Sequence, residues 1–144
     1  MKNTENNTAQ ALSGPWRLLP DPDNTGKKEQ WFKAIPGKAR PAPVPGIIQE
    51  VFPDYHGVAW YWLKFKATLN AGQHDRILLQ FGAVDYLAEV WLNDQPVGGH
   101  EGGETPFSLD VTAAINRDRG NLMAVRVLKP THERIDGIAL NETP

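Results

Sequence analysis

The sequence contains no cysteine and only two serines among its 144 residues. The lack of cysteine excludes a disulfide framework and a thiol nucleophile. A serine nucleophile needs a histidine and a carboxylate within reach, and neither Ser13 nor Ser108 lies in a motif of that kind. The formal net charge of -2 gives no general attraction to nucleic acid or to an anionic membrane, so neither is expected as a partner.

Long apolar runs are missing as well. No window holds the roughly 18 consecutive apolar residues that a membrane-spanning helix needs. The polar start MKNTENNTAQ lacks the apolar core of a signal peptide, so we expect a cytoplasmic location. A hydrophobic fraction of 40% over this length is typical of a globular domain with its own core. We expect a flexible arm over residues 1–13 and one domain over residues 14–144.

The sequence is rich in apolar and polar residues that alternate with a period of two, the spacing at which successive side chains point to opposite faces of a β-sheet. Four stretches show it: WYWLKFKATL (60–69), RILLQF (76–81), YLAEVWL (86–92) and LMAVRVL (122–128). Short strands separated by turn residues, without a long helical period, predict an all-β fold, an antiparallel jelly-roll β-sandwich.

In each stretch one alternating set is expected to face the interior of the sandwich. The inward set is Tyr61, Leu63, Phe65, Ile77, Leu79, Phe81, Ala88, Val90, Leu92, Met123, Val125 and Val127. The opposite set includes Trp60, Trp62 and Trp91, whose indoles could pack on the apolar faces of sugar rings if they are exposed. Because tryptophan is highly buried on average, we favour the alternative that another part of the protein covers them. Glu89 and Arg126, on the same face, could form a cross-strand ion pair or contact a ligand.

The segments between these stretches carry turn and edge signals. Residues 15–19 (PWRLL) predict a short first strand, and residues 29–35 (EQWFKAI) predict a continuation of the sheet edge. The proline-dense residues 36–46 cannot join a central strand, and we expect them to cross one end of the sandwich. The pair Asn93–Asp94 suits a tight turn because both residue types tolerate left-handed geometry. A short helical turn is expected in residues 110–117.

The segment HEGGE (100–104) invites comparison with a zinc-protease motif, which needs two histidines four residues apart on one helical face. Here Glu104 takes the place of the second histidine, and Gly102 and Gly103 disfavour a helix. We therefore favour a glycine-rich loop and expect neither a metal nor a cofactor. Carboxylate pairs for glycoside hydrolysis can be drawn from the acidic residues here and upstream, but the sequence fixes no separation between them.

Five segments follow one another in a particular order: GPWRL, VPG, HGVAWYWLKF, ILLQFGAVDYLAEVWLNDQPVGGHEGGETPFSLDVTAAI and NLMAVRVLKP. Together, over residues 14–130, they resemble the amino-terminal sugar-binding domain of glycoside hydrolase family 2, the group of β-galactosidases, β-glucuronidases and β-mannosidases. The motif is specific because the strand, the LN turn and the ending VG.H.GG.TPF..D.T occur as a unit in that family. Asp94 stands where the family usually has glycine.

The resemblance implies a jelly roll whose glycine-rich segment belongs to a scaffold, with the catalytic glutamates on a separate (β/α)₈ barrel. Such a barrel takes about 250 residues, so the chain is expected to be a non-catalytic domain of a β-glycosidase that binds carbohydrate and packs on the barrel. The alternative is an autonomous carbohydrate-binding module.

The resemblance also implies that the sandwich lacks its final strands, because residues 131–144 resemble the approach to a further strand pair. An open sheet edge of that kind predicts self-association. The candidates for contact with carbohydrate or with another domain are Trp60, Trp62, Asp85, Trp91, His100, Glu101, Glu104 and His132.

Overall fold

The computed structural model of the protein describes residues 9–69, 71–72, 74–103, 105–131 and 135–136. Its regular elements are strands and two short 3-10 helices. The strands are β1 Trp16–Pro20, β2 Arg40–Ala42, β3 Gly57–Lys66, β4 Leu78–Phe81, β5 Leu87–Leu92, β6 Gln95–Glu101, β7 Phe107–Asp110 and β8 Gly120–Lys129. The 3-10 helices are η1 Trp31–Lys33 and η2 Ile48–Glu50. Within the described residues, no helix is both long and apolar enough to cross a membrane.

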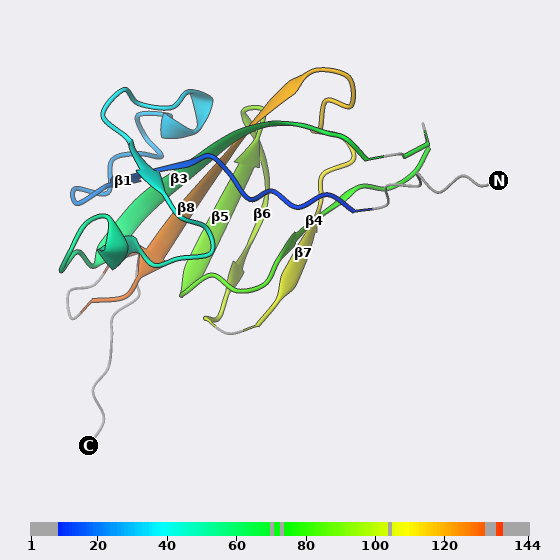
Figure 1. The fold of residues 1–144 in the computed structure, drawn as a ribbon. Helices are drawn as coiled ribbons and strands as arrows, with labels where there is room; N and C mark the ends of the chain where they lie inside the picture. The colour runs from blue at the N-terminus through cyan, green and yellow to red at the C-terminus, as the bar shows by residue number, and fades with distance from the viewer. Residues whose placement is uncertain (1–8, 70, 73, 104, 132–134, 137–144) are drawn as a thin grey trace.

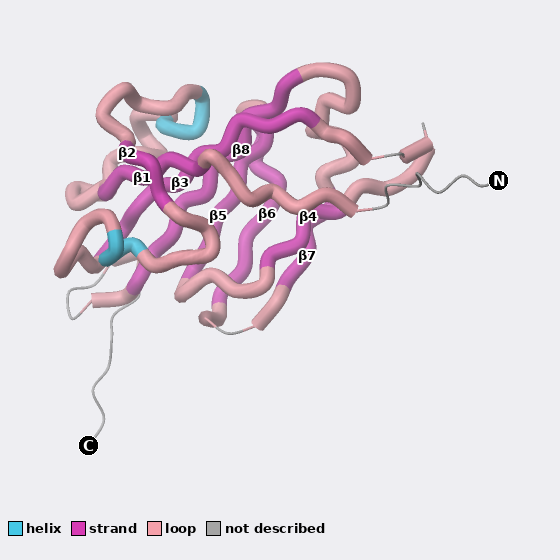
Figure 2. The backbone as a smooth tube through the Cα atoms, in the orientation of Figure 1, coloured by secondary structure: helices cyan, strands magenta, loops and turns pink. Residues whose placement is uncertain are grey.

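The strands form two antiparallel sheets. Six of them make one sheet in the order β2-β1-β3-β8-β5-β6, and β4 pairs with β7 in a second, two-stranded sheet (Figure 1). Figure 2 shows the strands as the dominant element, with the helical turns confined to the connections before β2 and before β3. The predicted all-β sandwich is confirmed.

The inner face of the large sheet carries the side chains that the alternation placed there. Leu63, Ala88, Val90, Leu92, Met123, Val125 and Val127 are buried in one cluster with Ile77, and Tyr61, Phe65, Leu79 and Phe81 pack against it. A slip of one residue in any strand would have turned its apolar set outward. The predicted inward faces are therefore confirmed in all four stretches.

The outer face of the same sheet is covered as well. Trp60 and Trp62 are fully buried and Trp91 is 7% exposed, in a second apolar cluster beneath residues 31–39. The ring of Phe32 stacks on Trp91 with the centroids 5.0 Å apart. The favoured alternative, that another part of the protein covers these indoles, is thus confirmed. The other alternative, that they are exposed and pack on sugar rings, is wrong.

Two edge predictions need correction. Residues 29–35 were expected to continue the sheet edge, but their aromatic side chains turn over the outer face through the helix η1 instead. Residues 36–46 were expected to cross one end of the sandwich, but three of them form β2, which pairs with β1 at the edge of the large sheet. Proline is tolerated there because an edge strand leaves one side of its backbone unpaired.

The connections contain the predicted turns. Asn93 and Asp94 have φ values of 52° and 71° and link β5 to β6 as the two central residues of a tight turn. After β7, the backbone N–H groups of Ala114 and Ile115 both donate to the carbonyl of Val111, which gives the expected helical turn.

Candidate functional site

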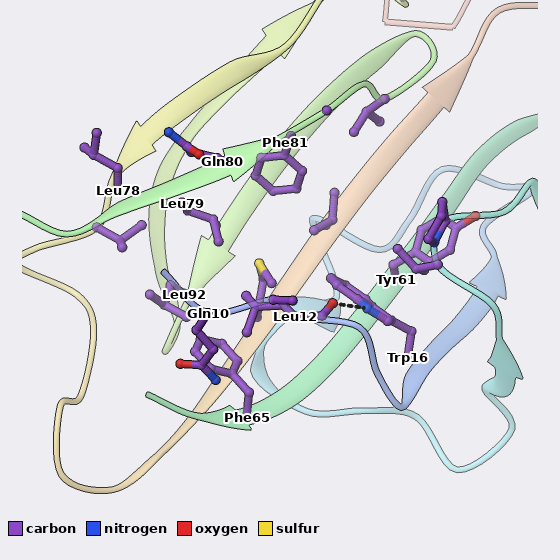
Figure 3. Close-up of a pocket in the computed structure, with 18 of the residues that line it drawn as sticks. Gln10, Leu12, Trp16, Tyr61, Phe65, Leu78, Leu79, Gln80, Phe81 and Leu92 are labelled. Atoms are coloured by element: carbon purple, nitrogen blue, oxygen red, sulfur yellow. Dashed lines mark hydrogen bonds between the residues drawn. The ribbon is translucent and has the colours of Figure 1, made fainter. Parts of the chain in front are cut away.

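A groove of about 1000 Å³ lies between the two sheets. It exists because β4 and β7 cover only part of the inner face of a six-stranded sheet. The large sheet contributes Trp16, Tyr61 and Phe65 to the lining, and β4 contributes Leu79 and Phe81 (Figure 3). The lining is thus mainly aromatic and aliphatic.

Two features make the groove suited to contact with another apolar surface. Ile47 and Leu78, the two large apolar side chains that are exposed among the described residues, are 60% and 45% exposed, and both belong to the lining. Burial of Tyr61, with a smaller contribution from the negative charge of Glu50, raises its pKa to about 12. A tyrosine hydroxyl is neutral at physiological pH even at its ordinary pKa, and burial in the groove shifts Tyr61 further toward the neutral form.

The amino-terminal segment runs along the same groove. The side chain of Gln10 bonds to β3 and the residues after it, donating to the carbonyl of Lys66 at 2.9 Å and accepting from the backbone N–H of Thr68 at 2.7 Å. The carbonyl of Leu12 accepts a hydrogen bond from the indole of Trp16 at 2.9 Å (Figure 3). A flexible arm was expected over residues 1–13. Within it, the Gln10 side chain and the Leu12 carbonyl are hydrogen-bonded to β1, to β3 and to Thr68. Residues 1–8 lie outside the described residues.

The remaining candidate residues lie where β5 begins and β6 ends. Asp85 Oδ2 is 3.3 Å from the ammonium of Lys129, and the hydroxyl of Tyr86 donates to Glu101 at 2.8 Å. That hydrogen bond raises the pKa of Tyr86. The ring of His100 stacks on Phe107 with the centroids 4.5 Å apart. Each of the three described candidates therefore has a contact within the fold, whereas Glu104 and His132 lie outside the described residues.

The glycine-rich segment begins in a strand: Gly98 and Gly99 belong to β6, and Gly102 and Gly103 follow its end. Gly98 has a φ of 131°, and a side chain there would also approach Leu109 to 2.9 Å. A side chain on Gly103 would lie 2.8 Å from Asp85 Oδ1, so the Asp85 carboxylate rests against the backbone of this loop. The glycines thus permit close backbone approach, as expected, but the predicted loop over HEGGE is wrong in part, because His100 and Glu101 belong to β6.

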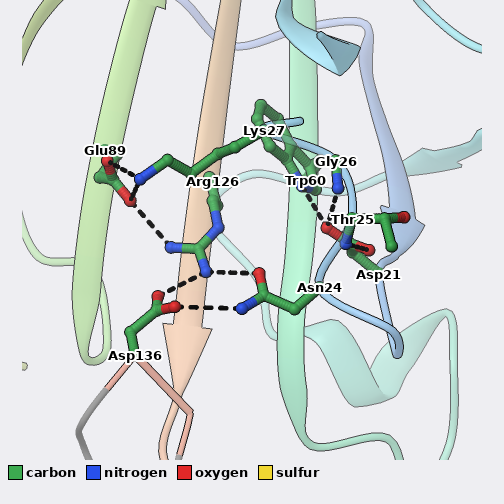
Figure 4. Close-up of polar contacts among 9 residues, drawn as sticks. All are labelled: Asp21, Asn24, Thr25, Gly26, Lys27, Trp60, Glu89, Arg126 and Asp136. Carbon is green, nitrogen blue, oxygen red and sulfur yellow. Dashed lines mark hydrogen bonds and ion pairs between the residues drawn. The ribbon is translucent and has the colours of Figure 1, made fainter. Parts of the chain in front are cut away.

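A polar network crosses the outer face of the large sheet (Figure 4). Arg126 is 1% exposed and donates to Glu89 at 2.8 Å, to Asn24 at 2.7 Å and to Asp136 at 2.5 Å. Lys27 also pairs with Glu89, at 3.0 Å. Of the two alternatives for Glu89 and Arg126, the structure shows the cross-strand ion pair.

Asp136 and Asn24 were not predicted from the sequence as members of this network. Burial opposes ionisation of Asp136, but the hydrogen bonds from Arg126 and Asn24 and the charge of Arg126 prevail and lower its pKa. Neither partner belongs to a strand: Asn24 lies in the turn-rich loop after β1, and Asp136 lies in the segment after β8. The one available signal was Arg126 itself, a cation at a strand position whose neighbours are apolar.

Asp21 anchors the loop that leads into this network. Its carboxylate is 1% exposed and accepts hydrogen bonds from the indole of Trp60 at 3.0 Å and from the backbone N–H groups of Thr25 and Gly26 at 2.9 and 2.8 Å. These contacts hold the start of the loop on the sheet (Figure 4). The network and the loop therefore help to cover the apolar cluster on the outer face of the large sheet. Their contacts join parts of the fold to one another, which is a structural role.

The profile of the family described as "Glycosyl hydrolases family 2, sugar binding domain" matches residues 46–142. The chain belongs to this family. The β-glucuronidase of Paenibacillus borealis is 32% identical over 131 residues, a match that covers 88% of this chain and 22% of that protein. The human β-glucuronidase is 31% identical over 145 residues, covering 92% and 21%.

Solved structures agree with the sequence match. The β-glucuronidase of Ruminococcus gnavus in complex with D-glucaro 1,5-lactone superposes with a TM-score of 0.81 at 27% identity, over 92% of this chain and 24% of that chain. Another crystal structure of the same enzyme gives a TM-score of 0.80 at 27% identity, over 90% and 22%. The chain thus spans less than a quarter of the length of these relatives, and it corresponds to their sugar-binding domain.

Proposed function

We propose that the chain is the non-catalytic sugar-binding domain of a β-glucuronidase-type glycosidase, in which it packs on a catalytic barrel and shapes the rim of the sugar pocket. The similarity to proteins named β-glucuronidase, among them a solved complex with a glucaro-lactone, supports a glucuronide as the substrate class. The carbohydrate and the barrel are the partners in this proposal.

The observation that carries the proposal is the distribution of apolar side chains. An autonomous carbohydrate-binding module should present aromatic rings beside polar groups at its surface. Here Trp60 and Trp62 are buried, and Trp91 lies under Phe32. The exposed apolar residues Ile47 and Leu78 instead share one groove, and an exposed apolar patch favours contact with another protein part.

A domain exchange tests the proposal. This chain would replace the matching part of the Paenibacillus borealis β-glucuronidase, and hydrolysis of nitrophenyl β-glucuronide would be measured. We expect the chimera to hydrolyse the glucuronide and a version with the domain deleted to lose that activity. A soluble, folded chimera without activity would contradict the proposal.

The isolated chain provides the matched control. Calorimetric titration with glucuronic acid should show no binding, because a sugar site that is shared with a barrel is incomplete without it. Binding by the chain alone would favour the autonomous module instead.

The proposal includes a further partner, a second copy of the chain, which would pair at an open sheet edge. Such an edge presents unpaired N–H and C=O groups and attracts another strand.

A further inference from the structure

The segment that covers the outer face of the large sheet is strongly basic. Residues 27–40, with the sequence KKEQWFKAIPGKAR, contain five basic residues and one acidic residue, although the whole chain has a formal net charge of -2. The positive charge is therefore gathered over one face of the domain, and the rest of the chain is acidic.

Some charges of this segment are engaged within the fold and others are not. Lys27 pairs within the polar network of the outer face, and the guanidinium of Arg40 lies 4.8 Å from the centre of an aromatic ring. Glu29, the one acidic residue, accepts a hydrogen bond from an indole. The remaining lysines, among them Lys33 and Lys38, are exposed, and within the described residues none of them is in an ion pair.

The large sheet adds two exposed cations on the same face. Arg17 on β1 is the register partner of Trp62 on β3, and because cross-strand partners share a face, both side chains lie on the outer face. Lys64 follows Trp62 by two residues, on the same face and about 7 Å further along the strand. Arg17 and Lys64 therefore flank Trp62, and among the described residues neither is in an ion pair.

The covering segment brings its free lysines to these two cations. The indole of Trp62 donates to the carbonyl of Trp31 at 2.8 Å, which places the helix η1, and Lys33 at its end, over this part of the sheet. The carbonyl of the residue after Lys38 lies 3.5 Å from Nη1 of Arg17. Like charges that lie together without a counter charge repel each other, and a bound anion would relieve this repulsion.

We propose that this basic surface, formed by Arg17, Lys33, Lys38 and Lys64, binds an acidic polysaccharide, a chain whose uronate residues carry carboxylates. Several carboxylates on one chain can engage the four cations together, and such multivalent binding is much tighter than the binding of one group. Free glucuronic acid has a single carboxylate and should still show no measurable binding to the isolated chain. The proposal rests on the β-glucuronidase-type function and deepens it, because the substrate would then be a polymer of uronates that this domain holds.

A nucleic acid matches the basic surface less well. A duplex carries one negative charge for about every 1.7 Å of its length, whereas this surface offers four cations on a chain that is acidic elsewhere. Sugar rings also present apolar faces that pack on aromatic side chains, and Trp31 lies half-buried among the four cations. An acidic polysaccharide therefore fits both the charge and the aromatic content of the surface.

Fluorescence anisotropy with a labelled oligosaccharide of glucuronan, a polymer of glucuronate, tests the proposal on the chain itself. We expect binding at low ionic strength that weakens as salt is added, because salt screens exposed charges. Lys33→Gln/Lys38→Gln should raise the dissociation constant at least about tenfold, since it removes two of the four cations. Both lysines are exposed, so the variant should keep the melting temperature of the unchanged chain.

Arg76→Gln/Arg119→Gln is the matched control. It changes the net charge by the same amount, but Arg76 lies before β4, where it pairs with Asp110, and Arg119 lies just before β8. We expect its dissociation constant to stay within about twofold of the unchanged chain, since a surface charge away from a contact has little effect.

Two further probes define the partner. A neutral glucose oligosaccharide of the same length should not bind, and single-stranded DNA of the same length should bind more weakly than glucuronan. Absence of glucuronan binding at low ionic strength, equal weakening by the two double variants, equal binding of the neutral oligosaccharide, or tighter binding of the DNA would each overturn the proposal.

The result is separable from that of the domain exchange. A chain that fails to bind glucuronan while the chimera hydrolyses nitrophenyl β-glucuronide would overturn the basic surface and leave the proposed function standing. An inactive chimera together with glucuronan binding that depends on Lys33 and Lys38 would contradict the proposed function and support the basic surface as a polysaccharide-binding site.

Discussion

Arg126 and Glu89 are register partners on the neighbouring strands β8 and β5, and their side chains meet at 2.8 Å on the outer face of the large sheet. The guanidinium is buried, and it also holds Asn24 and Asp136, which come from segments 102 and 10 residues away in the sequence. One cation thus joins two strands, a loop and the segment after β8. The ion pair is therefore part of the covering of the outer core.

Replacing Arg126 by methionine should lower the free energy of unfolding. The change removes the ion-pair partner of Asp136 and one of the two cations at Glu89, which keeps its pair with Lys27. The two carboxylates are 33% and 31% exposed, so water can solvate them in part. We therefore expect a loss of about 2 kcal/mol, below the range for a fully buried pair. Urea unfolding measures it. Arg119→Met is the control, because Arg119 forms a 3.8 Å pair with Asp118 at the surface, and equal losses for the two variants would contradict the assigned role.

Alanine at Gly26 should also destabilise the fold. A methyl group there would lie 2.4 Å from the indole nitrogen of Trp60 and 2.7 Å from Asp21 Oδ2, so it would disrupt the hydrogen bonds that anchor the loop. We expect a loss of about 2 kcal/mol in urea unfolding, together with a change in tryptophan fluorescence. Gly37→Ala is the matched control, because its methyl group would meet nothing within 4 Å. A stable Gly26→Ala variant with unchanged fluorescence would show that the loop is not anchored in this way.

The alternation of apolar residues was sufficient to predict the inward face of each long strand, because burying one face of a sheet fixes its register. It was not sufficient for the outer face. Residues 31–39 cover most of it, and residues 20–28 add the Asp21 loop beside Trp60. The sequence of this loop is typical of a surface segment, since it is rich in Pro, Asp, Asn and Gly. A usable signal was present in β3, where Val58 to Leu63 form a continuous apolar run, which is typical of a strand buried on both faces.

The candidate site was harder to predict than the fold. Tryptophan at an outward strand position has the same sequence signature whether a sugar or Phe32 covers it, so Trp91 could not be assigned from the pattern. The groove depends on how many strands the second sheet contributes, which is a property of the topology and not of any one segment. The members of the Arg126 network come together only in the folded chain, because Asn24 and Asp136 belong to loops without periodicity.

Stability should fall in acid because of Asp110. Hydrogen bonds from the Thr112 hydroxyl and backbone N–H, and then from Arg76, lower the pKa of this carboxyl group to about 2. A lowered pKa stabilises the folded state above the unfolded value near 4, and that contribution is lost as the pH falls toward about 2. We expect Asp110→Asn to flatten the dependence of the melting temperature on pH in this window. Asp118→Asn, which removes a carboxylate with an 86% exposed side chain, should leave the dependence unchanged, and the reverse result would contradict the prediction.

The isolated chain should hydrolyse no aryl glycoside. Hydrolysis requires one carboxyl group that stays protonated as an acid and a second at a defined separation. Asp85 pairs with Lys129, Glu89 with Arg126, and Glu101 accepts from Tyr86, so each of these carboxylates has a contact within the fold. Assays at high protein concentration would use nitrophenyl galactoside, glucuronide, mannoside and glucoside, with Glu101→Gln and Glu104→Gln as controls for a contaminating enzyme. Turnover by the unchanged chain that disappears in either variant would overturn the non-catalytic assignment, whereas turnover that persists in both would be traced to a contaminant.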